Sequence, residues 1–129
     1  MTKTISLKQD LLKASGKLKE ALSVEPTELN QDATIQRFEF TFELAWKLMQ
    51  EILKENRIDV YGVKSVFRES ANLGLIENPV IWFEFLEARN LSTHTYDFDE
   101  ARSIYIKIKD FPQLIDSFLD KVELQGPTS

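Results

Sequence analysis

Hydrophobic residues recur at intervals of three and four along most of this chain, rather than at every second position. This spacing is typical of amphipathic α-helices, because 3.6 residues complete one helical turn. Only four glycines and four prolines interrupt the pattern, and no repeat or second apolar block indicates another domain. We therefore predict an all-α protein with a single compact domain over residues 1–129.

The pattern predicts a first helix from about Leu7 to Leu22, ended by Pro26, and a second from about Asp32 to Glu55. One apolar stripe of the second helix contains Ile35, Phe38, Phe42, Ala45, Met49 and Ile52. Further apolar residues widen this stripe, namely Phe40, Leu44, Trp46 and Leu48. Because so wide an apolar arc needs two partners, we expect a second chain to cover part of it. The remaining polar residues form a ridge with i,i+4 spacing: Glu39, Glu43 and Lys47.

Capping residues set the bounds of the later helices. A short helix over about 63–72 is closed by Gly74 in the left-handed conformation. Asn78 and Pro79 are an N-cap and a first helical residue for a fourth helix, from Val80 to about His94. A fifth helix starts at the acidic segment 97–100, and Pro112 kinks or restarts it. We expect the tail, residues 125–129, to be frayed.

Composition narrows the chemistry. The chain has no cysteine and one histidine, so no disulfide, zinc pattern or other metal or cofactor site is indicated. No apolar run approaches the roughly twenty residues that cross a bilayer, and no signal peptide is evident, so we expect a cytoplasmic protein. The net charge of −5 argues against indiscriminate nucleic-acid binding, so any contact with RNA has to be local.

Candidate chemistry concentrates in the segment 89–96, which contains Arg89, Asn90, the single histidine His94, and Tyr96. An arginine can clamp a phosphodiester, and histidine exchanges protons near neutral pH. On a regular helix Arg89 and His94 lie about 140° apart. They converge on one phosphate only if the helix loosens or a second chain contributes, and a two-fold dimer satisfies this condition.

A dimer also supplies the two proton-transfer groups that metal-free RNA cleavage needs. One His94 can take the 2′-hydroxyl proton and the other can protonate the leaving 5′-oxygen, while Arg89 stabilises charge on phosphorus. The product is a 2′,3′-cyclic phosphate. An arginine and a histidine in a helical domain are also often structural, and Trp46 and Trp82 fit a core or dimer interface better than an exposed base-stacking site. Glutamates 39, 43, 84 and 87 fit a solvated face better than a metal site.

The motif Arg89-x4-His94-x-Tyr96, with the polar Asn90 after the arginine, resembles the HEPN superfamily and its HepT-type toxins. Two blocks, residues 36–47 and 89–97, are similar to proteins described as nucleotidyltransferase substrate-binding proteins. The resemblance covers roughly Leu7 to Leu119. It implies a four- to five-helix up-and-down bundle with a core of about residues 7–119, a homodimer, and a separate minimal nucleotidyltransferase as partner.

For HepT-type members the resemblance implies a metal-independent ribonuclease toxin, inhibited when the partner, acting as the antitoxin, transfers AMP to Tyr96. Arg89 and His94 would then be catalytic, with Asn90 and Thr93 supporting them. The alternative is a non-catalytic subunit that binds a nucleotide or substrate for the transferase. A third possibility, an inert scaffold, predicts that Arg89 and His94 are buried and paired internally.

Overall fold

The structure is a computed structural model, and it describes residues 2–93 and 97–125. These residues form six α-helices and no strand. The helices are α1 (Thr2–Leu22), α2 (Glu28–Glu55), α3 (Val63–Leu73), α4 (Pro79–Ser92), α5 (Phe98–Ile108) and α6 (Phe111–Leu124). The all-α prediction is confirmed. α5 and α6 are the two parts of the predicted fifth helix, which restarts at Phe111 and Pro112.

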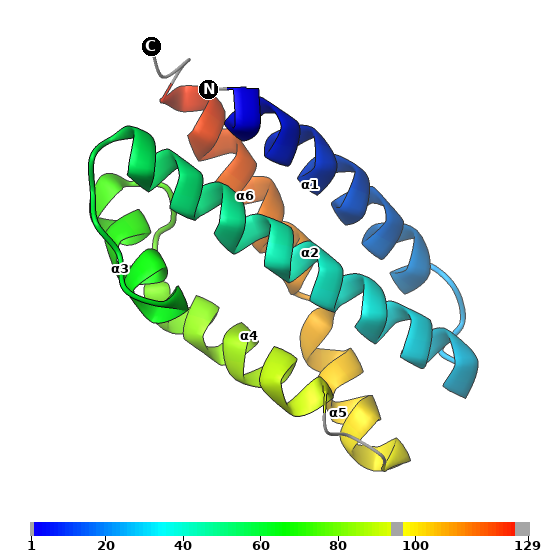
Figure 1. Ribbon diagram of the computed structural model, residues 1–129. Helices are drawn as coiled ribbons and strands as arrows, with labels where there is room; N and C mark the ends of the chain where they lie inside the picture. Colours follow the sequence, from blue (N-terminus) through cyan, green and yellow to red (C-terminus); the bar gives the residue numbers. More distant parts are fainter. Residues whose placement is uncertain (1, 94–96, 126–129) are drawn as a thin grey trace.

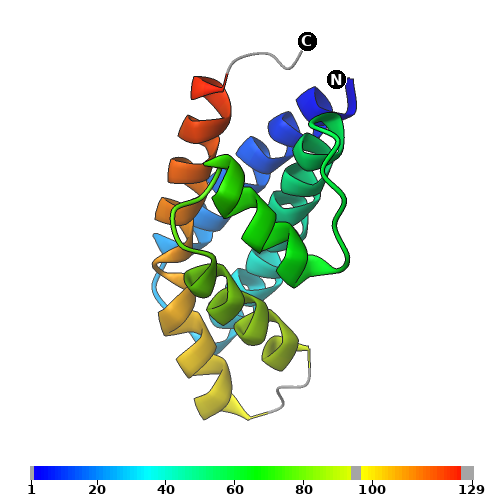
Figure 2. The same ribbon diagram turned by 90° about the vertical axis from the view of Figure 1, so that its left-hand side faces the viewer.

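The long helix α2 is the centre of the bundle and contacts α1, α3, α4 and α5. Figure 1 shows α1 and α2 side by side, with α6 behind them and α4 below α2. Figure 2 shows α3 and α4 on the near side of the bundle, and in both views the start of α1 and the end of α6 lie at the same end of the molecule. α2 therefore separates the α1 side from the side that carries α4.

Aromatic rings fill the core between α2, α4 and the two last helices. Phe38 is fully buried and its ring lies 5.0 Å from that of Phe111 and 6.0 Å from that of Phe85. Trp82 of α4 is also buried, with its ring 5.5 Å from that of Phe67. The predicted apolar stripe of α2 is buried throughout. Burial of these large rings supplies most of the driving force that docks α4 on α2.

Local signals fix the ends of α3 and α4 as the sequence predicts. Gly74 ends α3 with φ +88° and ψ 13°, a left-handed conformation that glycine adopts without steric cost. The Asn78 side chain accepts a hydrogen bond from the Val80 N–H at 2.9 Å, with Pro79 in the first turn of α4. Asp97 similarly accepts from the Asp99 N–H at 3.0 Å and begins α5.

The first two helices begin earlier than the sequence predicts. α1 starts at Thr2 rather than Leu7, because polar contacts tie its first turns to α2: the Thr4 hydroxyl donates to Glu55 at 2.6 Å. α2 starts at Glu28 rather than Asp32, because the Thr27 side chain accepts from the Asn30 N–H at 3.2 Å and caps the helix there. Periodicity alone underestimated both helices because these contacts involve polar residues.

Two predictions at helix ends need correction. α4 ends at Ser92, with Thr93 as its C-cap, rather than at about His94. Gln125, placed by the sequence in a frayed tail, donates from its side-chain amide to the Leu73 carbonyl at 2.9 Å; the rest of that tail, 126–129, lies outside the described residues. Within the described residues, no helix is long and apolar enough to span a membrane.

Candidate functional site

The last turn of α4 carries the first half of the candidate motif. Arg89 and Ser92 lie on its inner side, half-buried, whereas Asn90 and Thr93 are more peripheral. The Arg89 side chain keeps 34% of its surface exposed. The two other residues of the motif, the predicted catalytic residue His94 and the candidate modification site Tyr96, lie outside the described residues.

Glu43 of α2 holds the Arg89 guanidinium. The Arg89 Nη2 donates to Glu43 Oε1, and the pair is an ion pair across the α2–α4 contact. The Trp46 indole N–H donates to the other carboxylate oxygen, Oε2, at 3.1 Å. The Arg89 Nη1 donates to the side-chain oxygen of Asn90 at 3.0 Å. Arg89 is thus paired internally, as the scaffold interpretation predicts, but part of its surface remains accessible.

A second polar contact lies one turn earlier on α2. The Ser92 hydroxyl is 2.6 Å from Glu39 Oε2 and 2.8 Å from the Arg89 carbonyl oxygen. A hydroxyl has one proton to donate, and a carboxylate is the stronger acceptor because it is charged. The Ser92 hydroxyl therefore donates to Glu39. The Thr93 hydroxyl donates to the Asn90 carbonyl at 2.9 Å. The C-terminal end of α4 is therefore held by Glu39 and Glu43 of α2 and by the Thr93 hydroxyl.

A pocket of about 250 Å³ opens beside Ser92. It is lined by residues of α2, α4 and α5: Asp32, Ile35, Gln36, Glu39, Ser92 and Ala101. Two of these carry carboxylates and none is a cation. The pocket lining is therefore acidic, and Arg89 lies one turn before Ser92 on α4, where its partly exposed guanidinium could attract a phosphate.

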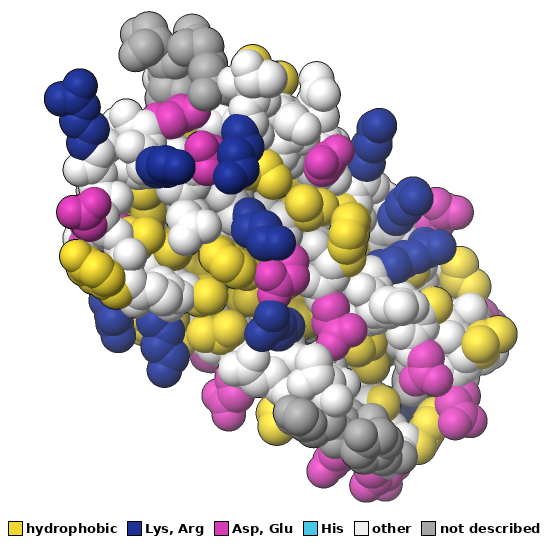
Figure 3. Space-filling view, viewed as in Figure 1, with side chains coloured by type: hydrophobic (Ala, Val, Ile, Leu, Met, Phe, Trp, Pro, Cys, Tyr) yellow, Lys and Arg dark blue, Asp and Glu magenta, His cyan; other side chains and the backbone are white. Residues whose placement is uncertain are grey.

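The face that carries α2 and α4 is partly apolar. Figure 3 shows hydrophobic side chains gathered along α2 and over the region between α2, α3 and α4, with charged side chains among them. A pocket of about 310 Å³ is lined by residues of α3 and α4: Lys64, Val80, Phe83, Glu84, Leu86, Glu87 and Asn90. On α2 itself Phe40 is 63% exposed. A contiguous apolar surface, rather than a single exposed ring, is typical of a protein contact surface.

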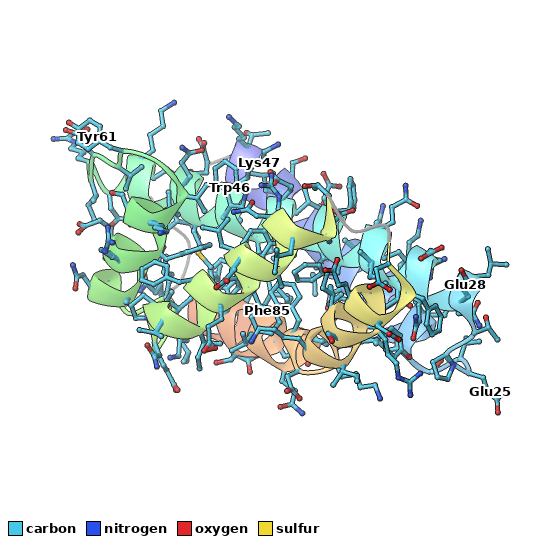
Figure 4. The ribbon with its side chains drawn as sticks, turned by 90° about the horizontal axis from the view of Figure 1, so that it is seen from below. Glu25, Glu28, Trp46, Lys47, Tyr61 and Phe85 are labelled. Carbon is cyan, nitrogen blue, oxygen red and sulfur yellow. The ribbon has the colours of Figure 1, made fainter. Side chains whose placement is uncertain are left out.

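The tryptophans lie where the sequence predicts. Trp82 is 2% exposed and Trp46 is partly buried against the core. Figure 4 shows Trp46 and Lys47 on α2 beside α4, and Phe85 inside the bundle. Neither tryptophan is an exposed platform for a nucleic-acid base.

The interpretation of Glu39 and Glu43 as a solvated ridge was wrong. Both are half-buried and contact α4. The available signal was their position, because two carboxylates spaced i,i+4 within a wide apolar arc need polar partners when that arc is buried. No group of three or more acidic or histidine side chains in the described residues is arranged to hold a metal ion.

Comparison with known proteins places the chain in a family. The model of the family "Nucleotidyltransferase substrate binding protein like" matches residues 7–124. A Haemophilus influenzae protein named "Probable ribonuclease HepT" is 39% identical over 82 residues, which cover 60% of this chain and 56% of that protein. The chain thus aligns with little more than half the length of this relative.

Solved structures share the fold. A crystal structure of a Thermus thermophilus protein superposes with a TM-score of 0.82 and 32% identity, over 88% of this chain and 98% of that one. A Haemophilus influenzae protein, whose structure is described as the fold of a substrate binding domain of a nucleotidyltransferase, gives a TM-score of 0.80 and 27% identity over 89% and 98% of the two chains. The chain therefore belongs to the nucleotidyltransferase substrate binding protein like family, with the HEPN-like helical fold that its motif indicated.

Proposed function

We propose that this chain is a metal-independent endoribonuclease of the HepT type, which acts as a homodimer. The observation that carries the proposal is the placement of Arg89. It lies in the last turn of α4 with its guanidinium partly exposed, and the rest of the R-x4-H-x-Y motif follows it in sequence. The similarity to a probable ribonuclease HepT supports the same reaction. Arginine offers a planar set of donors suited to a phosphodiester, and the motif adds a histidine for proton transfer.

In the proposed reaction the RNA 2′-oxygen attacks the adjacent phosphorus. The new bond joins O2′ to phosphorus, the P–O5′ bond breaks, and a 2′,3′-cyclic phosphate and a 5′-hydroxyl result. His94 of one protomer takes the 2′-hydroxyl proton and His94 of the other gives a proton to O5′. Arg89 stabilises the charge that develops on the phosphoryl oxygens, and Asn90 and Thr93 support it.

The proposed partner is a separate minimal nucleotidyltransferase that acts as antitoxin. It transfers AMP from ATP to the Tyr96 hydroxyl with release of pyrophosphate. The added phosphate places bulk and negative charge two residues from His94, which excludes an RNA phosphodiester from the same place. Membership in a family named for nucleotidyltransferase substrate binding supports this partnership.

The test is to incubate the purified chain with total cellular RNA in EDTA, beside a His94→Ala variant. Fragments ending in 2′,3′-cyclic phosphate, absent with the variant, support the proposal. Undiminished cleavage by His94→Ala contradicts it. Mass spectrometry of the wild type first excludes AMP already on Tyr96.

The transfer step is tested by incubation with the partner transferase and ATP. Tyr96→Phe should lose the modification, whereas Tyr61→Phe, at a tyrosine that is 85% exposed, should keep it.

A second candidate is a non-catalytic subunit that binds a nucleotide or substrate for the partner transferase. The acidic surroundings of the site favour this candidate. Asp32 and Glu39 line the pocket beside Ser92, and Glu43 is ion-paired with the Arg89 guanidinium. Such surroundings weaken the binding of a polyanion. Unmodified wild type that leaves RNA intact but binds a nucleotide or the transferase in isothermal titration would support this candidate. Binding of neither would contradict it.

A further inference from the structure

Glu43 lies at the centre of a series of polar contacts that joins α2 to the candidate site. Each of its two carboxylate oxygens accepts from a different partner: Oε1 from Arg89 and Oε2 from the Trp46 indole N–H, at 3.1 Å. The carboxylate is therefore oriented from both sides. Trp46 is packed against the core, so one of these two contacts is fixed by the body of the bundle.

The same helix holds α4 at a second point. Glu39 lies one turn before Glu43 on α2, and its Oε2 accepts from the Ser92 hydroxyl at 2.6 Å. Arg89 and Ser92 are likewise about one turn apart on α4. Two such contacts between the helices fix both the position and the rotation of the last turn of α4. The direction of the Arg89 side chain is therefore set by α2.

The contacts of Arg89 still leave donors for a ligand. A guanidinium carries five N–H donors, and the described contacts use one on Nη1 and one on Nη2. About a third of the side chain is exposed. The negative charge of Glu43 weakens the attraction of Arg89 for an anion, while the bond itself removes rotational freedom that binding would otherwise have to remove. The charge of Glu43 therefore opposes the binding of RNA, whereas the fixed direction of Arg89 favours the geometry in which its donors reach the transition-state phosphate.

Resting on the proposed ribonuclease function, we propose that Glu43 is a positioning residue, fixed by Trp46, that aims the free donors of Arg89 at the transition-state phosphate. The negative charge of Glu43 then lowers the affinity of the site for RNA in the ground state. The fixed direction of the Arg89 side chain raises the rate of the chemical step. A glutamine at position 43 has the same shape but only one acceptor oxygen, so it cannot accept from both Arg89 and Trp46. The proposal therefore predicts that Glu43→Gln lowers kcat, because Arg89 loses its fixed direction, but does not raise KM, because the opposing charge is gone.

The kinetic test is Glu43→Gln, which keeps the size of the side chain and loses its charge. We expect kcat to fall by roughly tenfold or more, since misplacing a group that binds the transition state is costly, while KM stays equal or falls. The matched control is Glu20→Gln, at an exposed position of α1, which removes the same charge from a helix that does not carry the site. Unchanged kcat in Glu43→Gln, or a lower kcat with an equally large rise in KM, would overturn the proposal.

A structural readout separates this proposal from the ribonuclease itself. The chain has two tryptophans, and the Trp46 indole donates to Glu43 whereas Trp82 is buried in the core, so the Trp82 indole N–H resonance is an internal reference in a ¹⁵N-labelled sample. Arg89→Ala should shift the Trp46 indole resonance and leave that of Trp82 in place. An unmoved Trp46 resonance would overturn the coupling between Glu43 and Arg89. Wild type that does not cleave RNA would contradict the function instead, and the NMR result would still decide the coupling.

Discussion

Glu43 of α2 and Arg89 of α4 are 46 residues apart in sequence and form an ion pair that joins the two helices beside the candidate site. Both side chains are partly exposed, at 28% and 34%. The pair is therefore neither a surface contact fully screened by water nor a buried pair that carries a large desolvation penalty. It can hold Arg89 in place and still leave it accessible.

The stability that this pair contributes should be small but measurable. In a double-mutant cycle with Glu43→Ala and Arg89→Ala, we expect a coupling free energy of about 0.5–1 kcal/mol, discounted for partial exposure. The control cycle is Lys19 with Asp116, a pair at 2.9 Å whose side chains are 49% and 53% exposed. Its coupling should be smaller because water screens it more. Urea unfolding followed by circular dichroism gives both values, and equal couplings would contradict the prediction.

Two glycines should respond to alanine in opposite directions. Gly16 lies inside α1 with nothing within 4 Å of an added Cβ, so Gly16→Ala should raise the free energy of unfolding by about 0.5–1 kcal/mol. Gly74 has φ +88° at the end of α3, where an alanine side chain is strained. Gly74→Ala should lower the free energy of unfolding by about 1–2 kcal/mol. Thermal or urea unfolding measures both; stabilisation by Gly74→Ala would contradict the assigned conformation.

Periodicity and caps were enough to predict most of the fold. The stripe from Ile35 to Ile52 and the signals at Asn78 and Gly74 are local properties, and the structure keeps them. The start of α1 could not be predicted in this way, because Thr4 is fixed by Glu55, a residue distant in sequence. A contact between polar side chains adds nothing to the hydrophobic periodicity from which a helix is predicted.

In the candidate site, too, local sequence signals were predictable and contacts between distant residues were not. Arg89 and Asn90 were predicted from the motif, and the structure places them in contact. Glu39 and Glu43 were misassigned to solvent, because the helical pattern of α2 shows which residues share a face but not which helix packs on that face. Their roles become visible only when α4 is docked. The roles of His94 and Tyr96 remain predictions from the motif.

The core should depend strongly on Phe38. This ring is fully buried and contacts Phe42, Phe85 and Phe111, all within 6.0 Å between centroids. Phe38→Ala removes these contacts and leaves a cavity, so we expect the free energy of unfolding to fall by about 3–5 kcal/mol. Tyr61→Ala, at an aromatic side chain that is 85% exposed, should change it by less than about 0.5 kcal/mol. Similar values from urea unfolding of the two variants would contradict the assigned core.

The proposed homodimer can be tested at Phe40. Its ring is 63% exposed on α2, next in sequence to Glu39, and Leu44 lies one turn further along, only partly buried. A second copy that covers this face would bury both side chains, and a buried carboxylate without a partner is costly.

Phe40→Glu should therefore shift the sedimenting species from dimer to monomer while the helical circular dichroism stays unchanged. Leu12→Glu, at a leucine that is 52% exposed on α1, is the matched control and should remain dimeric. If the two histidines of the dimer share the proton transfers, RNA cleavage by Phe40→Glu should fall together with the dimer fraction. A monomeric wild type that cleaves RNA, or a dimer that persists in Phe40→Glu, would show that this face does not bind the second copy.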